Sequence, residues 1–161
     1  MKKIRVGLGY DVHALAEGES LWLGGIEIEH ELGTVAHSDG DVLLHAISDA
    51  ILGAAKLRDI GYHFPDTSAE FKGADSSILL KECVRMVEQK GYVIGNVDAT
   101  IAAQQPKLMP YIPQMEVAIA NTLGVDEEDV SVKATTTEKL GFEGRQEGIS
   151  VQAVVLLYQK E

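Results

Sequence analysis

The chain has 161 residues, of which 45% are hydrophobic and 24% charged, and its net charge is −11 from 25 acidic and 14 basic residues. This length and composition are typical of one globular domain, which we expect to comprise residues 1–161. Such an acidic surface repels nucleic acids, anionic membranes and phosphorylated metabolites. A phosphate ester could therefore bind only where metal ions or local cations make the electrostatic potential positive.

The first predicted element is a strand over about residues 5–15, which begins so early that no apolar leader precedes it. No apolar run approaches the roughly 18 residues needed to span a bilayer, so we expect a cytoplasmic protein. A short extended segment over 21–28 is interrupted by Gly24-Gly25. Apolar residues at helical spacing predict a helix over 39–56, and Ser38 with Asp41 three residues later matches a capping box.

The later elements alternate between helix and strand. They are a loop over 57–74, a helix over 75–89, a strand over 92–103, a helix over 110–123 that ends at Gly124, a strand over 130–134, a loop or short helix over 135–146 and a strand over 149–158. The single cysteine, Cys83, lies among apolar residues at helical spacing and is expected in the core. The predicted fold is α+β: one small domain with a sheet of about four strands and helices on one face.

Three residues could meet around a metal ion. Asp11 and His13 are two apart on the first strand, so both side chains point to the same face, roughly 6 to 7 Å apart along it. His45 comes from the next helix, on its less apolar side. Two imidazoles and a carboxylate leave one open position on tetrahedral zinc, which is typical of catalytic zinc. Taken singly, each residue is more simply a strand histidine, a core histidine or a turn former, so the spacing alone is only moderately specific.

Three further segments carry polar groups suited to phosphate or to a flat ring. His37-Ser38-Asp39 would lie at the start of a helix, where unpaired amides attract anions, although Ser38 also reads as a simple cap. Thr135-Thr136-Thr137-Glu138 follows a strand, and Glu138 is a hard oxygen ligand suited to Mg²⁺ or Mn²⁺. Residues 102–109 form a strand end and a turn that could hold a flat ring. A threonine run alone more often reflects β-propensity.

Together these segments resemble the 2-C-methyl-D-erythritol 2,4-cyclodiphosphate synthase family of the non-mevalonate isoprenoid pathway, over essentially the whole chain. The motifs that carry the resemblance are Gly9-Tyr10-Asp11-Val12-His13, Ala36-His37-Ser38-Asp39-Gly40-Asp41 through His45, Asp59-Ile60-Gly61 with Phe64-Pro65-Asp66, Pro106-Lys107, and Thr135-Thr136-Thr137-Glu138-Lys139-Leu140-Gly141-Phe142 through Gly144-Arg145.

The resemblance implies a homotrimer with active sites between adjacent subunits, and it implies a role for each matching residue. Zinc would be bound by Asp11, His13 and His45, and a second ion, Mg²⁺ or Mn²⁺, by Glu138, with Thr136 also catalytic. The methylerythritol phosphate would contact His37, Ser38, Asp59, Gly61, Phe64 and Asp66. The cytidine and diphosphate would contact Ala103, Pro106, Lys107, Met109, Ala134, Thr135 and Thr136. A central cavity that can hold an isoprenoid diphosphate would be lined by Phe142, Arg145 and Glu147.

The implied reaction is a metal-dependent intramolecular phosphoryl transfer. The 2-phosphate of 4-diphosphocytidyl-2-C-methyl-D-erythritol 2-phosphate attacks the β-phosphorus and releases CMP, which makes the enzyme a cyclising phosphorus–oxygen lyase. A phosphate monoester has a second pKa of about 6, so the nucleophile needs no strong protein base. Two alternatives stay open at this point. One is a zinc-dependent hydrolase of a nucleoside diphosphate; the other is a non-enzymatic trimer that senses isoprenoid diphosphates through Arg145.

Overall fold

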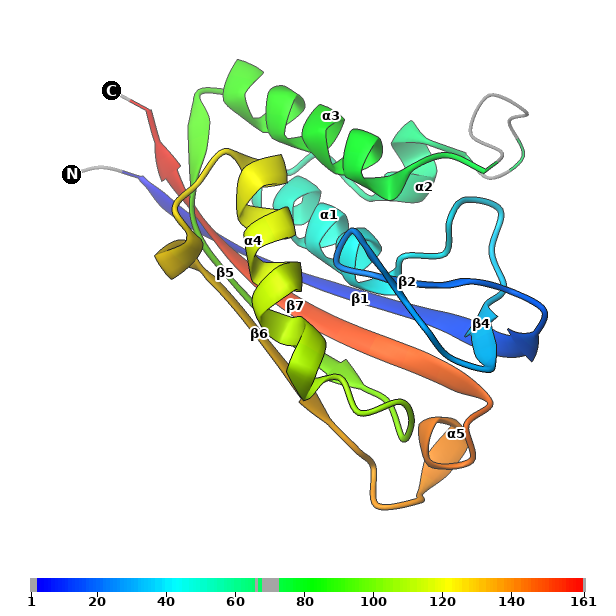
Figure 1. Cartoon of the computed structure of the whole chain (residues 1–161). Coiled ribbons are helices and arrows are strands. Elements are labelled where there is room, and N and C mark those ends of the chain that lie inside the picture. Colours follow the sequence, from blue (N-terminus) through cyan, green and yellow to red (C-terminus); the bar gives the residue numbers. More distant parts are fainter. Residues whose placement is uncertain (1–2, 66, 68–72, 161) are drawn as a thin grey trace.

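The computed structural model describes residues 3–65, 67 and 73–160 (Figure 1). The strands are β1 (Ile4–Glu17), β2 (Leu21–Leu23), β3 (Ile26–Ile28), β4 (Leu32–Thr34), β5 (Tyr92–Ala102), β6 (Val130–Thr135) and β7 (Gly148–Gln159). The α-helices are α1 (Val42–Ala54), α2 (Ile60–His63), α3 (Ser76–Gln89), α4 (Ile112–Leu123) and α5 (Gly141–Gly144), with short 3₁₀ turns η2 (Met109–Tyr111) and η3 (Glu127–Asp129).

The main sheet has the strand order β4-β1-β7-β5-β6 and is antiparallel except for the β5–β6 pair. Within the described residues it therefore has five strands, one more than the sequence predicted. The additional strand is β4, whose three residues pair with the end of β1 and are too few to show an alternating pattern. Strands β2 and β3 form a separate hairpin around Gly24-Gly25, where the interruption was expected. The α+β class is confirmed.

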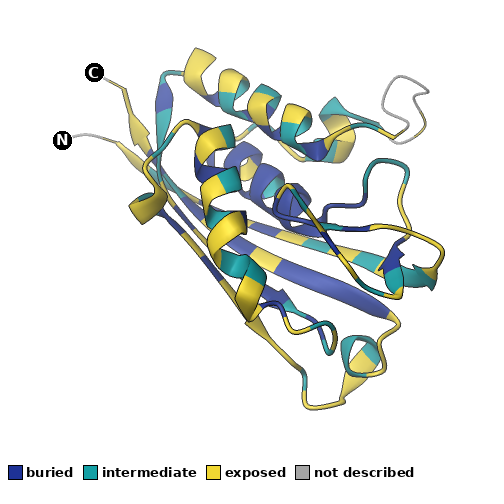
Figure 2. Ribbon diagram, in the orientation of Figure 1, coloured by how far each residue is buried: buried dark blue, intermediate teal, exposed yellow. Residues whose placement is uncertain are grey.

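The helices cover one face of the main sheet. Figure 1 shows α1 lying against the sheet, α3 stacked beyond it and α4 beside it. Both α1 and β7 are buried along most of their length (Figure 2). The prediction of helices on one face is confirmed. Among the described residues, none of the helices has the length and apolar character that crossing a bilayer requires.

Two glycines bring α1 unusually close to β1. A Cβ atom at Gly7 would lie 1.9 Å from the carbonyl oxygen of Ala50, and one at Gly9 would lie 1.8 Å from that of Ala46. Any side chain at these positions would therefore push the helix away. Asp11 and His13 continue the same face of β1 beyond the glycines, so this close packing places the N-terminal part of α1 directly beside them.

The opposite face of the sheet is apolar and uncovered. Alternate residues of β1 point to this face and are exposed, and Leu8 retains 67% of its accessible surface. On the neighbouring strand β7, Val154 and Tyr158 are also exposed. A single chain thus leaves a broad apolar surface in contact with water, which is typical of a protein-interaction surface.

Several predicted boundaries are close to the observed ones, and the differences have local causes. Helix α4 ends at Gly124, which adopts a left-handed conformation with φ 71° as expected for a helix C-cap. The prediction that residues 57–74 contain no helix was wrong, because α2 forms a single turn there. A bulge between Ile94 and Asn96 shifts the alternation of β5, so that Val93 is only partly buried whereas Val97 is buried.

Candidate active site

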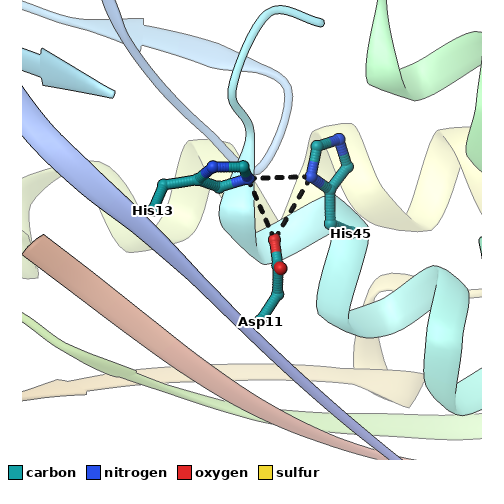
Figure 3. Close-up of side chains that lie close together, drawn as sticks. All are labelled: Asp11, His13 and His45. Carbon is teal, nitrogen blue, oxygen red and sulfur yellow. Dashed lines mark hydrogen bonds and ion pairs between the residues drawn. The ribbon is translucent and has the colours of Figure 1, made fainter. Parts of the chain in front are cut away.

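The predicted meeting of Asp11, His13 and His45 is confirmed. Asp11 and His13 point from β1 toward His45, which lies one turn inside α1 (Figure 3). One carboxylate oxygen of Asp11 lies 3.1 Å from His13 Nε2 and 3.2 Å from His45 Nδ1. The two imidazole nitrogens are 3.1 Å apart. Three potential ligand atoms from two elements thus form a nearly equilateral triangle.

The size of this triangle fits a bound metal ion. Zinc–nitrogen and zinc–oxygen bonds of about 2.0–2.1 Å at tetrahedral angles place neighbouring ligand atoms about 3.3 Å apart. The three observed separations of 3.1–3.2 Å are within the range that such a site needs. Because one carboxylate and two imidazoles supply only three ligands, a fourth position would remain for substrate.

The charges around the triangle favour a cation. Burial alone would raise the pKa of Asp11, but the hydrogen bonds and charges of His13 and His45 outweigh it and lower the pKa to about 2. Burial disfavours the charged form of His45, yet the hydrogen bond and charge of Asp11, aided by Asp41 and Asp39, raise the pKa of that imidazole. The carboxyl groups of Asp11, Asp39 and Asp41 therefore make the electrostatic potential at this largely buried site negative.

A backbone carbonyl orients the first imidazole. His13 Nδ1 lies 3.3 Å from the carbonyl oxygen of Val35. Because a carbonyl can only accept, this contact keeps a proton on Nδ1, so in the neutral ring the nitrogen that carries a lone pair toward Asp11 and His45 is Nε2. This outer hydrogen bond is the usual way in which proteins fix a histidine for metal binding.

Helix α1 begins later than predicted, and its cap is a different residue. The helix starts at Val42, and the side chain of Asp41 accepts a hydrogen bond from the Leu44 amide at 3.0 Å. The predicted capping box at Ser38 was therefore wrong, and His37 and Ser38 lie in the loop before the helix. Asp41 is fully buried because it also accepts from the amides of Gly24 and Gly25, at 2.9 and 2.7 Å.

The buried carboxylate of Asp41 ties the β2–β3 turn to the start of α1. Burial raises the pKa of Asp41, and the three amide donors oppose that shift. Sequence reasoning treated Asp41 only as a possible partner of Ser38. Its real partners, Gly24 and Gly25, precede it by 17 and 16 residues, and no local pattern links them.

A cavity of about 440 Å³ opens beside the three ligands. Its lining includes the three ligands and four more of the predicted residues, namely His37, Ser38, Gly61 and Phe64. Asp59 does not line it; its side chain caps α2 by accepting from the Tyr62 amide at 2.8 Å. The prediction for Asp66 falls outside the described residues. The remaining lining residues, which sequence reasoning missed, are Val35, Ala36, Ile60 and Leu79.

A second cavity, of about 370 Å³, lies where the parallel strands β5 and β6 end side by side. Its lining contains all seven residues predicted to hold the cytidine and diphosphate: Ala103, Pro106, Lys107, Met109, Ala134, Thr135 and Thr136. No residue lines both this cavity and the first one. The ends of parallel strands are a common place for nucleotide binding.

Glu138 lies on an exposed turn after β6. Its carboxylate accepts a hydrogen bond from the Thr136 hydroxyl at 3.1 Å. Glu138 and Lys139 both have positive φ angles, 54° and 64°, which non-glycine residues seldom adopt and which are often found at functional turns. The Lys139 amide donates to the side chain of Gln104 at 3.1 Å, so the turn is held against the second cavity. Among the described residues Glu138 belongs to no three-ligand cluster.

The residues predicted to line a central cavity lie on or beside α5. Arg145 donates from Nε to Glu147 at 2.8 Å, and both side chains are more than half exposed. Phe142 belongs to the same short helix and packs near Gly148. These residues lie in neither of the two cavities.

One contact to the metal-ligand residue His45 was not predicted from the sequence. Ser76, at the start of α3, places its hydroxyl 2.8 Å from His45 Nε2 and is 1% exposed. In the sequence, Asp75-Ser76-Ser77 signals only the beginning of a helix. Ser76 and His45 are 31 positions apart in the sequence, so no local pattern joins them.

Comparison with known proteins places these features in a family context. A family model described as the YgbB family matches residues 4–158. The curated 2-C-methyl-D-erythritol 2,4-cyclodiphosphate synthase of Parabacteroides distasonis is 64% identical over 155 residues, 96% of each chain. The synthase of the same description from Porphyromonas gingivalis ATCC 33277 is 58% identical over 156 residues, 97% of this chain and 96% of the relative.

Solved structures of related proteins share the fold over nearly the whole of this chain. The bifunctional IspDF protein from Campylobacter jejuni superposes with a TM-score of 0.96 at 47% identity, over 100% of this chain and 44% of that protein. This chain therefore spans less than half of the bifunctional protein. The IspF protein of Plasmodium falciparum, in a CDP complex, superposes with a TM-score of 0.86 at 38% identity, over 98% of this chain and 97% of that protein.

Proposed function

The chain belongs to the YgbB family, and we propose that it converts 4-diphosphocytidyl-2-C-methyl-D-erythritol 2-phosphate to 2-C-methyl-D-erythritol 2,4-cyclodiphosphate and CMP, a step of the non-mevalonate isoprenoid pathway. Curated relatives at 58–64% identity carry the corresponding synthase name. In this reaction an oxygen of the 2-phosphate forms a bond to the β-phosphorus, and the bond from that phosphorus to CMP breaks. The enzyme is thus a cyclising phosphorus–oxygen lyase.

The metal-ligand triangle in the first cavity is the observation that carries this proposal. Asp11, His13 and His45 would hold zinc, for which their separations and negative potential are suited. When bound, the ion would act as a Lewis acid that polarises a phosphoryl oxygen. His37, Ser38 and Gly61 line the same cavity and would hold the methylerythritol phosphate. The roles of Asp59 and Asp66 in holding it rest on the sequence motif alone.

The second cavity would receive the cytidine and diphosphate. Its backbone groups at the ends of β5 and β6 and the side chain of Lys107 suit a flat ring and a phosphate. Thr136 would donate to the phosphate that receives the attack. Glu138 offers a single carboxylate, which suits Mg²⁺ or Mn²⁺ because such ions are often held by one or two carboxylates and the substrate phosphates.

We further propose that the active protein is a homotrimer with each site shared between two subunits. The uncovered apolar face of β1 and β7 supports an assembly, since a large exposed apolar surface is costly in water. The separation of the two sets of binding residues into cavities with no common residue supports a shared site. Phe142, Arg145 and Glu147 would then face a central cavity suited to an isoprenoid diphosphate.

The direct test is phosphorus NMR of the purified protein with 4-diphosphocytidyl-2-C-methyl-D-erythritol 2-phosphate and Mg²⁺, with and without a zinc chelator. Cyclic diphosphate and CMP that disappear on chelation would support both the reaction and the metal requirement. An open-chain product with a free terminal phosphate would instead identify a hydrolase. Unchanged substrate with a zinc-loaded protein would favour a binding protein.

A second experiment tests the shared site. His45→Ala and Glu138→Gln protomers are each expected to retain about 1% of parental turnover or less when expressed alone, and they can be co-expressed so that their subunits mix. If each site takes His45 from one subunit and Glu138 from the next, about a quarter of the sites in random mixtures regain both residues. A site built within one chain would regain no activity on mixing. Size-exclusion chromatography with light scattering on each variant checks that assembly is unchanged.

A further inference from the structure

We propose that Asp39, acting through the hydroxyl of Ser76, fixes His45 in the ring orientation and tautomer that direct its Nδ1 lone pair at Asp11 and His13. Asp39 and Ser76 are thereby positioning residues for the metal site. This inference rests on the proposed function only in that His45 binds zinc, and it assigns a role to two residues that lie outside the ligand triangle.

The three groups form a continuous chain of hydrogen bonds. Ser76 Oγ donates to Asp39 Oδ1 at 2.5 Å, and the Ser76 amide donates to Asp39 Oδ2 at 2.9 Å. Ser76 Oγ lies 2.8 Å from His45 Nε2. Ser76 is 1% exposed and His45 8%, so water does not compete freely for these contacts. Both oxygens of Asp39 are thus directed at one buried residue.

Counting protons along this chain determines the histidine tautomer. A serine hydroxyl has one proton, and that of Ser76 is directed at the carboxylate of Asp39. Toward His45 the hydroxyl oxygen can then only accept, so Nε2 must carry a proton. In the neutral ring the other nitrogen, Nδ1, is then the unprotonated one. This nitrogen is the atom that lies 3.2 Å from Asp11 Oδ2 and 3.1 Å from His13 Nε2.

Ser38 offers a competing contact that favours the opposite tautomer. Its hydroxyl lies 3.3 Å from His45 Nε2 and could donate to it, which would place the ring proton on Nδ1 and block metal binding. The Ser76 contact is shorter by half an ångström, and a donating Ser38 would leave two lone pairs facing each other across that shorter contact. Asp39 therefore decides between the two arrangements by orienting the Ser76 hydroxyl.

Asp39 is itself held by backbone groups of two segments, the loop before α1 and the residues before α3. Its amide donates to the carbonyl of Ala74 at 3.1 Å, and its Oδ1 accepts from the Asp41 amide at 3.1 Å. The carboxylate thus joins the loop that carries His37 and Ser38 to the first residue of α3. Outer hydrogen-bond partners of this kind typically change metal affinity by about 10–100-fold when removed.

The test compares zinc binding by the full-length parent protein with that of Ser76→Ala, Ser76→Thr and Asp39→Asn, using competition with a chromophoric chelator. Ser76→Ala is expected to weaken zinc binding about 10–100-fold, and Asp39→Asn several-fold. Ser76→Thr keeps the hydroxyl and should restore most of the affinity. The matched control is Ser77→Ala, one residue further along α3, which should bind zinc like the parent.

The double variant Ser76→Ala/Asp39→Asn tests whether Asp39 acts on zinc affinity through Ser76, here called the relay, or whether the two residues act independently. If Asp39 acts through Ser76, the double variant binds zinc no more weakly than Ser76→Ala alone. In the zinc-loaded parent, NMR should also show a slowly exchanging Nε2 proton on His45 that is lost in Ser76→Ala. Parental affinity in both single variants, or multiplication of their effects in the double variant, would overturn the relay. A parent protein that binds no zinc would overturn the metal site itself, and the relay with it.

Discussion

The two ends of the proposed active site are built in different ways. At the metal-ligand end, the side chains come from the regular elements β1 and α1, and His45 is 8% exposed and held on both ring nitrogens. At the other end, Thr136 and Glu138 lie on an exposed turn with two positive φ angles. The first end is complete and preorganised in one chain, whereas the second presents groups whose partners would be substrate or another subunit.

This difference is related to where each end lies in the sheet. The metal ligands face the covered side of β1, where α1 approaches closely over Gly7 and Gly9. The second cavity lies at the ends of β5 and β6, and its lining includes Thr135, in the last residue pair, and Thr136, which follows it. A buried side-chain cluster can fix a metal ion tightly, while a strand end leaves free backbone groups for a ligand.

The largest effect is expected at the metal-ligand end. His45→Ala removes one of three ligands and the only one supplied by α1, so we expect loss of zinc and a fall in turnover of at least about 1,000-fold. Elemental analysis for zinc and phosphorus NMR for turnover measure the two effects. Because the helix and its Asp41 cap remain, circular dichroism should show a folded protein.

His30→Ala is the matched control for that variant, because it removes an imidazole that lines neither cavity. It should keep parental zinc content and turnover. An active His45→Ala protein without zinc would show that the triangle is not the metal site.

At the exposed end, Glu138→Gln should lower turnover about 100-fold, since it removes one charge while keeping side-chain size and the bond from Thr136. Zinc affinity should not change, because Glu138 is outside the triangle. Steady-state kinetics at increasing Mg²⁺ concentration and zinc competition measure the two quantities. Glu128→Gln, on η3, is the control. A parallel fall in zinc affinity would mean that the two ends are coupled within one chain.

The sequence predicted the metal-ligand end well because its information is local and periodic. Alternation along β1 placed Asp11 and His13 on one face, and helical spacing placed His45 near the start of a helix. The supports of these ligands could not be predicted in the same way. Asp39, Ser38 and Asp41 are all good cap residues, and the buried bonds to Gly24 and Gly25 select Asp41.

Other features were missed because their signals are short or distant. Strand β4 has three residues, and α2 is a single turn. The bulge in β5 changed which side chains are buried, and its one mark in the sequence is Gly95, a single glycine within the strand. The roles of the residues at the exposed end stay predictions, as does the trimer, because one chain alone presents neither the substrate nor a neighbouring subunit.

The hydrogen bonds of Asp41 that hold the metal-ligand end in place should contribute measurably to the free energy of unfolding. Asp41→Ala leaves three backbone amides without acceptors, two of them buried, which we expect to cost about 3 kcal/mol, and Asp41→Asn about 1–2 kcal/mol because one acceptor oxygen remains. Urea unfolding followed by circular dichroism at fixed protein concentration measures both. Asp126→Ala removes an exposed cap and should cost less than about 1 kcal/mol. Equal costs at Asp41 and Asp126 would contradict the view that the metal-ligand end is the rigid one.

The smallest effect is expected for the hydrogen bond that holds the Glu138 turn at the exposed end. Gln104 accepts a single hydrogen bond from the Lys139 amide, and such a bond contributes about 0.5–1.5 kcal/mol. Gln104→Ala should therefore raise KM roughly 2- to 5-fold through a looser Glu138 turn, with zinc affinity and unfolding free energy close to parental. Steady-state kinetics measure KM, and Gln114→Ala on the exposed side of α4 is the control. A large loss of stability in Gln104→Ala would show that this turn is part of the folded core, and the contrast between the two ends would then be one of exposure alone.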